Sequence, residues 1–275
     1  MKKEVDVIIN LYGKPYQTLC TLKSLMHHSG QHIDKIYVIQ EQEQPDLTDF
    51  SIVYTKFDNL LIYKPSVFNF INKGEQLEYD YERLSVRYQY GIEKSDKKYV
   101  FITHNDVLYT GDIVGNMLNE IGDCIGIGEI GQCWNCPANS VGLCSGEKFY
   151  DWNPTYQEVM ALPLPHTRTF PNMISPTNPK PMPECRLNEW ACMINREITN
   201  KEGYPYFGIY NVDLGDVWFK QMHLKGYKFK DYRNDFKHKY WANDWGYQVQ
   251  LNKEQYAKAE LEAKRYFEQN YENTH

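Results

Sequence analysis

Four short apolar runs, separated by longer segments, decide the fold class of this chain. The runs are VDVIINL at 5–11, KIYVIQ at 35–40, NLLIY at 59–63 and YVFIT at 99–103. Pro15 begins a predicted helix after the first run, and apolar residues three and four apart predict another helix at about 75–93. Strands that are apolar throughout and alternate with helices form mostly parallel sheets. The pattern predicts an α/β domain with a Rossmann-like sheet.

The fourth run ends abruptly on three polar residues, His104, Asn105 and Asp106. Open α/β sheets bind their ligands beyond the carboxyl ends of the strands, so Asp106 is placed to meet a metal ion or a nucleotide. A polar turn that only closes the strand would have the same sequence. A helix at about 111–121 and a strand at 125–131 are predicted to follow.

Composition excludes several classes of protein. With 42% hydrophobic and 24% charged residues, the 275-residue chain is expected to be globular. Its net charge of −6 provides no basic surface for nucleic acid. The N-terminal MKKEVDVIINLYGK is neither a signal peptide nor a membrane span, which predicts a cytoplasmic protein. The 23 Tyr suit stacking on sugars or bases, although an AT-rich coding bias would give the same count.

The segment 132–187 differs from the rest of the chain. It contains nine prolines, which interrupt helices and sheet ladders. Four of the seven cysteines are also here: Cys133, Cys136, Cys144 and Cys185. Four thiolates around one zinc ion would order such a segment, while free thiols are the main alternative and a redox or iron–sulfur role a lesser one. We therefore expect one domain made of residues 1–131 and 188–275, with a Cys/Pro-rich insertion at 132–187.

Regular patterns return after the insertion, with EWACMINREI at 189–198, NVDLGDVWFKQMHLKGYKF at 211–229 and KHKYW at 237–241. A polar helix is predicted at 253–270, because Asn252 and Gln255 have the spacing of a capping box. Its thin apolar stripe predicts packing on the domain or on another subunit and consists of Tyr256, Ala259, Ala263 and Phe267.

In this order, the segments resemble the inverting GT-A-type glycosyltransferases, particularly the family-2 group. VDVIINLYGKPYQTLCTLKSL at 5–25 is similar to the opening strand and helix of that family, and HND at 104–106 stands where the family carries its Asp-x-Asp motif. EWACMINREITNKEGYPYF at 189–207 looks like the strand and turn at the acceptor site, and NVDLGDVWFKQMHLKGYKF looks like the segment with the catalytic base. The resemblance implies a single GT-A domain that transfers a sugar from a nucleotide diphosphate donor.

The resemblance also implies a donor site. Its residues would be Asn10 and Tyr12 after the first strand, Arg87 on the helix before HND, where Arg83 and Arg87 would share one face, and the motif residues His104, Asn105 and Asp106. The negative charge that develops on the leaving diphosphate needs a hard cation nearby. Asp106 would bind Mn²⁺ or Mg²⁺, and His238 would complete the site as the C-terminal His of the family does. His104 replaces the first Asp of the motif, which predicts weaker metal binding.

Inversion requires a carboxylate that accepts the proton of the acceptor hydroxyl. The resemblance leaves Asp216 and Asp213 as candidates, with Asp216 slightly favoured, although either could serve only as the N-cap of the following helix. Glu189 and Trp190 are predicted to bind the acceptor, a carbohydrate or a lipid-linked glycan. A lipid-linked acceptor would place the protein at the inner face of the membrane, in peripheral contact only.

Two other functions fit the same sheet. A sugar nucleotidyltransferase would need a Gly-rich, basic phosphate loop after the first strand, but LYGKPYQ has a single Gly and a single Lys. A carbohydrate-binding or scaffold protein with a GT-A shell and no catalytic activity is the second alternative, because His104 has replaced a carboxylate. The donor sugar, the acceptor and the linkage cannot be predicted from these residues.

Overall fold

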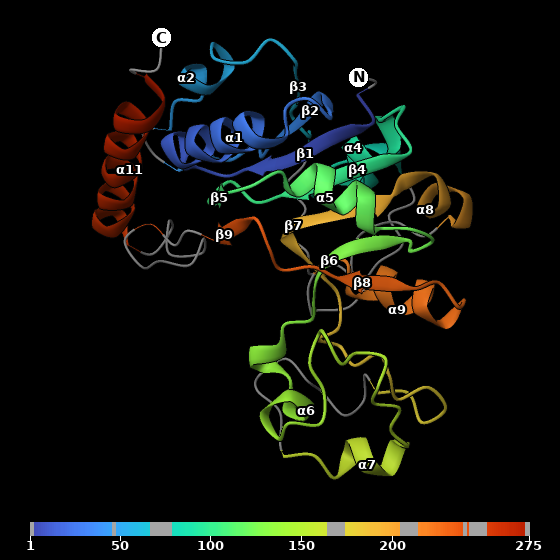
Figure 1. Cartoon of the computed structure of the whole chain (residues 1–275). Coiled ribbons are helices and arrows are strands. Elements are labelled where there is room, and N and C mark those ends of the chain that lie inside the picture. Colours follow the sequence, from blue (N-terminus) through green and yellow to red (C-terminus); the bar gives the residue numbers. More distant parts are fainter. Residues whose placement is uncertain are drawn as a thin grey trace.

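The structure, a computed structural model, describes residues 3–45, 48–66, 79–163, 174–203, 214–238, 241 and 252–272. Its centre is a seven-stranded sheet in the order β3-β2-β1-β4-β7-β6-β8 (Figure 1). The strands are β1 (Val5–Leu11), β2 (Ile33–Gln40), β3 (Leu60–Tyr63), β4 (Tyr99–Thr103), β6 (Gly126–Ile130), β7 (Leu187–Asn195) and β8 (Phe229–Asp231).

The sheet is mostly parallel, as the sequence predicts. β1 runs parallel to β2 and β4, β2 to β3, and β6 to β8. Only β7 is antiparallel, and it lies between β4 and β6. The apolar runs produce this arrangement because their side chains are buried on both faces of the sheet; Ile9 points into one buried cluster and its neighbour Ile8 into the other.

Helices cover both faces of the sheet. Buried residues of α1 (Pro15–Ser29), α5 (Ile113–Glu120) and α11 (Lys253–Phe267) belong to one cluster, and those of α4 (Gln89–Lys94) and α9 (Asp216–Leu224) to the other. Outside the insertion, the remaining described helices are α2 (Ser51–Tyr54), α3 (Asp80–Arg83), α8 (Arg196–Glu202) and the terminal turn η4 (Glu268–Glu272). Gly91 lets α4 approach β1 closely, since a Cβ there would lie 2.7 Å from the Ile8 side chain. None of the helices described is long and apolar enough to cross a membrane.

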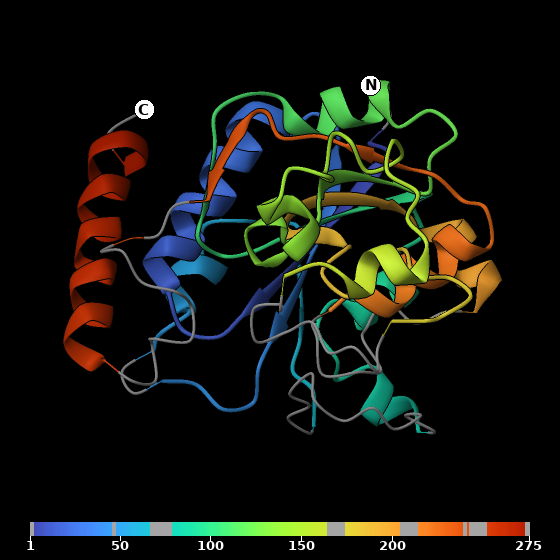
Figure 2. The same ribbon diagram turned by 90° about the horizontal axis from the view of Figure 1, so that it is seen from below.

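The predicted C-terminal helix is confirmed, and it packs on the domain. The side chain of Asn252 accepts a hydrogen bond from the Gln255 amide and caps α11. Ala259, Ala263 and Phe267 are buried with residues of α1, beside which α11 lies in Figures 1 and 2. The helix therefore supports the start of α1, which follows the first strand of the sheet.

The single continuous helix expected at about 75–93 is wrong over the described residues 79–94, and residues 67–78 lie outside the described part of the chain. Two short helices, α3 and α4, are separated by a turn in which Tyr88 has a φ of 68°. The ring of Tyr88 is 1% exposed, so its burial in the core outweighs the local helical spacing. Arg83 ends α3 and Arg87 lies in the turn, so the two arginines do not share a helix face.

The insertion follows β6 and contains η1 (Cys133–Asn135), α6 (Pro137–Ser140) and α7 (Tyr156–Met160). Figure 1 shows it as a lobe below β8 and α9. The lobe has some apolar packing of its own on α9, because the ring of Phe149 lies edge-on to Phe219 at 5.4 Å between centroids. Residues 164–173 of the lobe are not among those described.

Candidate functional site

The site lies where β1 and β4 end. The two strands are parallel neighbours, so the loop after β1, with Gly13 and Lys14, lies beside the residues that follow β4. His104, Asn105 and Asp106 lead directly into β5 (Val107–Tyr109). β5 pairs antiparallel with β9 (Phe236–His238), with Val107 opposite His238. A residue more than a hundred positions along the chain is thereby brought next to Asp106.

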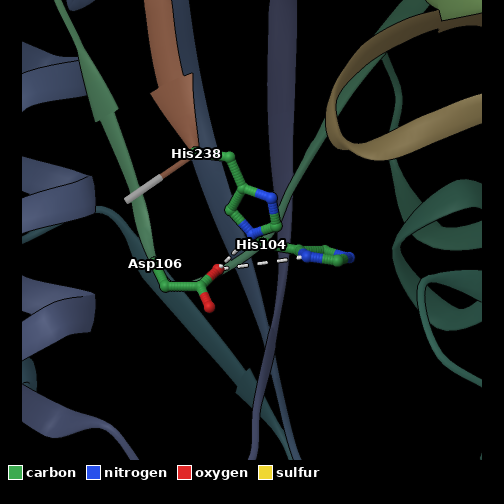
Figure 3. A group of neighbouring side chains, drawn as sticks. All are labelled: His104, Asp106 and His238. Carbon is green, nitrogen blue, oxygen red and sulfur yellow. Dashed lines mark hydrogen bonds and ion pairs between the residues drawn. The ribbon is translucent and has the colours of Figure 1, made fainter. Parts of the chain in front are cut away.

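Asp106 is the centre of the site and is 4% exposed. One carboxylate oxygen, Oδ2, accepts a hydrogen bond from the Lys14 ammonium at 2.7 Å. The other oxygen, Oδ1, lies 3.1 Å from Nε2 of His238 and 4.0 Å from Nδ1 of His104. Figure 3 shows both imidazoles directed at this oxygen from different segments of the chain. The carboxylate is thus shared between one ammonium and two imidazoles.

The surroundings set the charge of these groups. Burial alone would raise the pKa of the Asp106 carboxyl, but Lys14 and the hydrogen bond with His238 outweigh burial and hold this pKa well below its usual value. Burial, together with the nearby His104 and Lys14, lowers the pKa of His238 although Asp106 raises it. At neutral pH Asp106 is therefore a carboxylate and His238 is neutral, so His238 donates its Nε2 proton to Asp106.

Lys14 is held in place by its backbone. Gly13 and Lys14 both have left-handed φ angles, of 61° and 63°, and this conformation costs about 1 kcal/mol for a residue with a side chain. The Lys14 amide donates to the hydroxyl of Tyr256 on α11 at 2.8 Å, and its carbonyl accepts the Thr18 amide at 2.8 Å. The Asn105 side chain donates to the Gly13 carbonyl at 3.3 Å. The surrounding contacts thus stabilise a strained turn that directs Lys14 at Asp106.

A chain of charged groups leads from Asp106 towards α9. Nε2 of His104 lies 3.4 Å from the carboxylate of Glu189 on β7. The second oxygen of Glu189 accepts from Arg186 at 2.9 Å, and the same Arg186 nitrogen donates to the Leu214 carbonyl at 3.1 Å. Leu214 lies two residues before Asp216, so the start of α9 is tied to β7.

Asp216 is the first residue of α9 and is 6% exposed. Its carboxylate accepts the amide of the adjacent Val217 at 2.6 Å. The N-cap of α9 is Gly215 with a φ of 76°, so the interpretation of Asp216 as an N-cap is wrong. Asp213, the other candidate base, lies outside the described residues.

A second polar group lies beside the C-terminal ends of β1 and β2. Glu41, directly after β2, accepts a hydrogen bond from the Asn10 side chain at 2.7 Å and forms an ion pair with Arg87 at 3.1 Å. Tyr12 is half-buried in the loop between β1 and α1. Asn10 and Arg87, both expected at a nucleotide site, are therefore brought together by Glu41.

Aromatic rings form the third part of the site. Trp190 of β7 lies 5.0 Å from the ring of His238 and stacks with Trp134 of the lobe at 5.4 Å and 24°. Trp134 is 48% exposed, so part of its surface is accessible to a ligand. Trp134 comes from η1, between Cys133 and Cys136, and links the lobe to the site.

Four contributors were not predicted from the sequence: Lys14, Glu41, Arg186 and Trp134. Lys14 had a signal, since it is the one lysine in the loop after the first strand, but its partner lies 92 positions further on. Glu41 and Arg186 were recognisable only as charged residues next to predicted strands, and their contacts depend on the sheet order.

Among the residues that the structure describes, two groups of side chains have the spacing of a metal site. In the first, ligand atoms of His104, Asp106 and His238 all lie within 4.8 Å of one another. This set fits a divalent cation, because it combines two imidazoles with a carboxylate oxygen already directed at them. The second group, Asp6, Asp34 and Asp96, lies at the opposite end of the strands, and its carboxylates bind Lys35 and Lys97.

The seven-stranded, mostly parallel sheet has the arrangement of the GT-A fold, and polar residues gather beyond the ends of its strands β1 and β4. No protein-family model matches the chain, and no curated protein matches it in sequence.

Solved structures are similar to the chain in fold. A mannosyltransferase, PcManGT from Pyrobaculum calidifontis, in complex with GDP-Man and Mn²⁺, matches with a TM-score of 0.52 and 11% identity over 85% of this chain. S. aureus TarS in complex with UDP-GlcNAc matches with a TM-score of 0.45 and 12% identity over 86% of this chain. Glucosyl-3-phosphoglycerate synthase from Mycobacterium tuberculosis, in complex with Mn²⁺ and UDP-Glc, has a TM-score of 0.44 and 11% identity over 84%.

The chain spans 56% of the mannosyltransferase and 60% of the TarS chain, and 72% of the synthase. At these identities the likeness concerns the fold.

Proposed function

We propose that the protein is a glycosyltransferase that transfers a sugar from a nucleotide diphosphate donor to a hydroxyl of a carbohydrate or lipid-linked glycan, with inversion at the anomeric carbon. The observation that carries the proposal is the cluster of buried Lys14 and Asp106 with the partly buried His104 and His238, beyond the ends of β1 and β4. Buried charges of this kind are costly to maintain, so their concentration at this edge favours a binding role over a structural one.

The same cluster suits a diphosphate leaving group. Lys14 supplies a fixed positive charge, and the turn that carries it is held by Tyr256 and Asn105. His104, Asp106 and His238 would hold a divalent cation, which when bound supplies further positive charge to the departing diphosphate. Two imidazole nitrogens favour Mn²⁺ over Mg²⁺, because Mg²⁺ strongly prefers oxygen ligands. On the nucleotide side, Arg87 is oriented by Glu41 next to Asn10, with Tyr12 in the same loop region.

The acceptor would bind on the side of β7. Trp190 and Trp134 offer the stacked aromatic surface that sugar rings pack against, and Glu189 lies beside them with an oxygen near His104. Asp216 is proposed as the general base that accepts the proton of the attacking hydroxyl. The contacts of Arg186 support this assignment. Arg186 donates to Glu189 of β7 and to the Leu214 carbonyl just before α9, and so fixes the start of α9 relative to Glu189. Asp213 stays the alternative base.

Binding of nucleoside diphosphates tests the donor site. Thermal shift or calorimetry with UDP and GDP, with and without Mn²⁺, should reveal stabilisation of the wild-type protein by one of them. Asp106→Asn should weaken that binding at least about tenfold, which corresponds to the loss of one charge-assisted interaction of about 1.4 kcal/mol. Asp96→Asn is the matched control, because Asp96 is an exposed carboxylate at the opposite end of the sheet. Unchanged binding in Asp106→Asn would contradict the proposal.

The products separate this proposal from its two rivals. A glycosyltransferase releases the nucleoside diphosphate from its sugar donor, and slow hydrolysis should be measurable even without the acceptor. A sugar nucleotidyltransferase would instead release pyrophosphate from a nucleoside triphosphate. A carbohydrate-binding protein without activity would bind sugars and release neither product.

A further inference from the structure

We infer that Cys133, Cys136, Cys144 and Cys185 bind one structural zinc ion, and that this ion holds the turn that carries Trp134 against the sheet. The inference concerns the lobe and is independent of the reaction proposed above. It would add a second metal site, chemically distinct from the cluster around Asp106.

The four cysteines converge on one cavity although they come from three places in the chain; no three of their sulfur atoms lie within 4.8 Å of one another, so zinc would draw them closer together. Cys133 and Cys136 flank η1, Cys144 follows α6, and Cys185 lies two residues before β7. All four line a single cavity of about 10 Å³, enough for one sphere the size of a water molecule or a metal ion. The other three cysteines, Cys20, Cys124 and Cys192, are not part of this cavity. The convergence includes every cysteine of the insertion and none from elsewhere.

The chemistry of the donors favours zinc. Sulfur ligands select soft or borderline metals, and four thiolates at tetrahedral positions form a closed structural zinc site with Zn–S distances of about 2.3 Å. All four residues are free cysteines. The sulfurs of Cys133 and Cys144 make long contacts of 3.6 Å to the carbonyl oxygens of Ile130 and Ser145.

Backbone amides reach two of the sulfurs, although burial raises the pKa of all four thiols. Backbone hydrogen bonds reach the Cys136 sulfur from Ala138 and Asn139, two and three residues on, and the Cys133 sulfur from Gly146. Hydrogen bonds to metal-bound ligands orient them and stabilise their charge. Gly146 also has no room for a side chain, since a Cβ there would lie 2.5 Å from the Ile130 carbonyl oxygen. The backbone of Gly146 therefore lies close enough to the Cys133 sulfur for a hydrogen bond.

The position of the cavity explains what the ion would stabilise. The lobe packs on α9 through Phe149, whereas its η1 end bears the half-exposed Trp134. Trp134 lies between two of the proposed ligands and stacks on Trp190, which neighbours His238. Anchoring Cys133 and Cys136 to one ion would fix the turn on both sides of Trp134. The ion would thus connect the order of the lobe to the geometry of the aromatic surface.

Metal analysis of the full-length protein tests the inference directly. Protein purified without added metal and without chelators should contain about one zinc per chain, and replacement of zinc by Co²⁺ should give the strong visible absorption of tetrahedral thiolate coordination. Cys136→Ser and Cys185→Ser should each lose most of the zinc. Cys124→Ser, which removes a half-buried cysteine outside the cavity, should retain it.

A histidine substitution distinguishes lost ligation from lost folding. Cys144→His keeps a zinc-binding side chain and should retain more zinc than Cys144→Ser. The inference is overturned if the wild-type protein takes up no zinc after incubation with excess Zn²⁺ under reducing conditions. It is also overturned if the protein holds iron and acid-labile sulfide instead of zinc, or if Cys124→Ser loses as much zinc as Cys136→Ser.

Discussion

The ion pair between Lys14 and Asp106 should couple the two residues strongly in unfolding experiments. Its atoms are 2.7 Å apart, and the side chains are 8% and 6% exposed. At an effective dielectric constant of about 20 the Coulomb attraction is about 6 kcal/mol, much of which is offset by the desolvation of both charges. Removing one partner leaves the other charge buried, so Lys14→Met and Asp106→Asn should each cost about 3 kcal/mol of unfolding free energy.

The double variant leaves neither charge behind, so it should cost about as much as either single variant instead of their sum. The expected coupling energy is therefore about 3 kcal/mol, and no less than about 1.5 kcal/mol. Urea unfolding of the wild type and three variants, followed by circular dichroism and tryptophan fluorescence, measures it. The Lys35–Asp96 pair is the control: its atoms are 3.0 Å apart, but both groups are exposed, so coupling should be small and should fall with salt. Additive effects of Lys14→Met and Asp106→Asn would refute the reasoning.

Two further predictions concern other carboxylates. Asp216→Asn should lower sugar transfer at least about 100-fold with little change in donor affinity, because a general base acts only in the transition state; near-normal turnover would exclude Asp216. Burial raises the pKa of Glu260 to about 7, although hydrogen bonds from the amides of Tyr16 and Gln17 lower it. Since this pKa exceeds the unfolded value of 4.5, the contribution of Glu260 is fully present below pH 4.5 and is lost as pH rises through 7. Glu260→Gln should remove that decline, on the order of 3 kcal/mol at most, and an unchanged pH profile of unfolding would contradict the assignment.

Local sequence patterns predicted the helices and strands of this protein wherever one pattern lies within one helix or strand. The apolar runs at β1, β2 and β4 predicted strands because burial on both faces requires side chains that are apolar throughout. The Asn252 cap of α11 was readable because a capping interaction spans only three residues. The polar residues after β4 predicted a ligand-binding edge because the ends of parallel strands coincide. Each of these inferences depends on neighbours within a few residues.

The tertiary structure decided what depends on partners far away in sequence. The spacing near 75–93 favoured one helix, but burial of Tyr88 in the core breaks it. No sequence pattern indicated a partner for Lys14; the pairing of β1 with β4 brings it to Asp106. The pairing of β5 with β9 brings His238 to the same carboxylate. Strand β7 lies between β4 and β6 in the sheet, and this position places Glu189 and Trp190 beside the residues around Asp106. A sequence pattern records which face of an element is buried, but not which other element covers that face, and the site is made of such contacts.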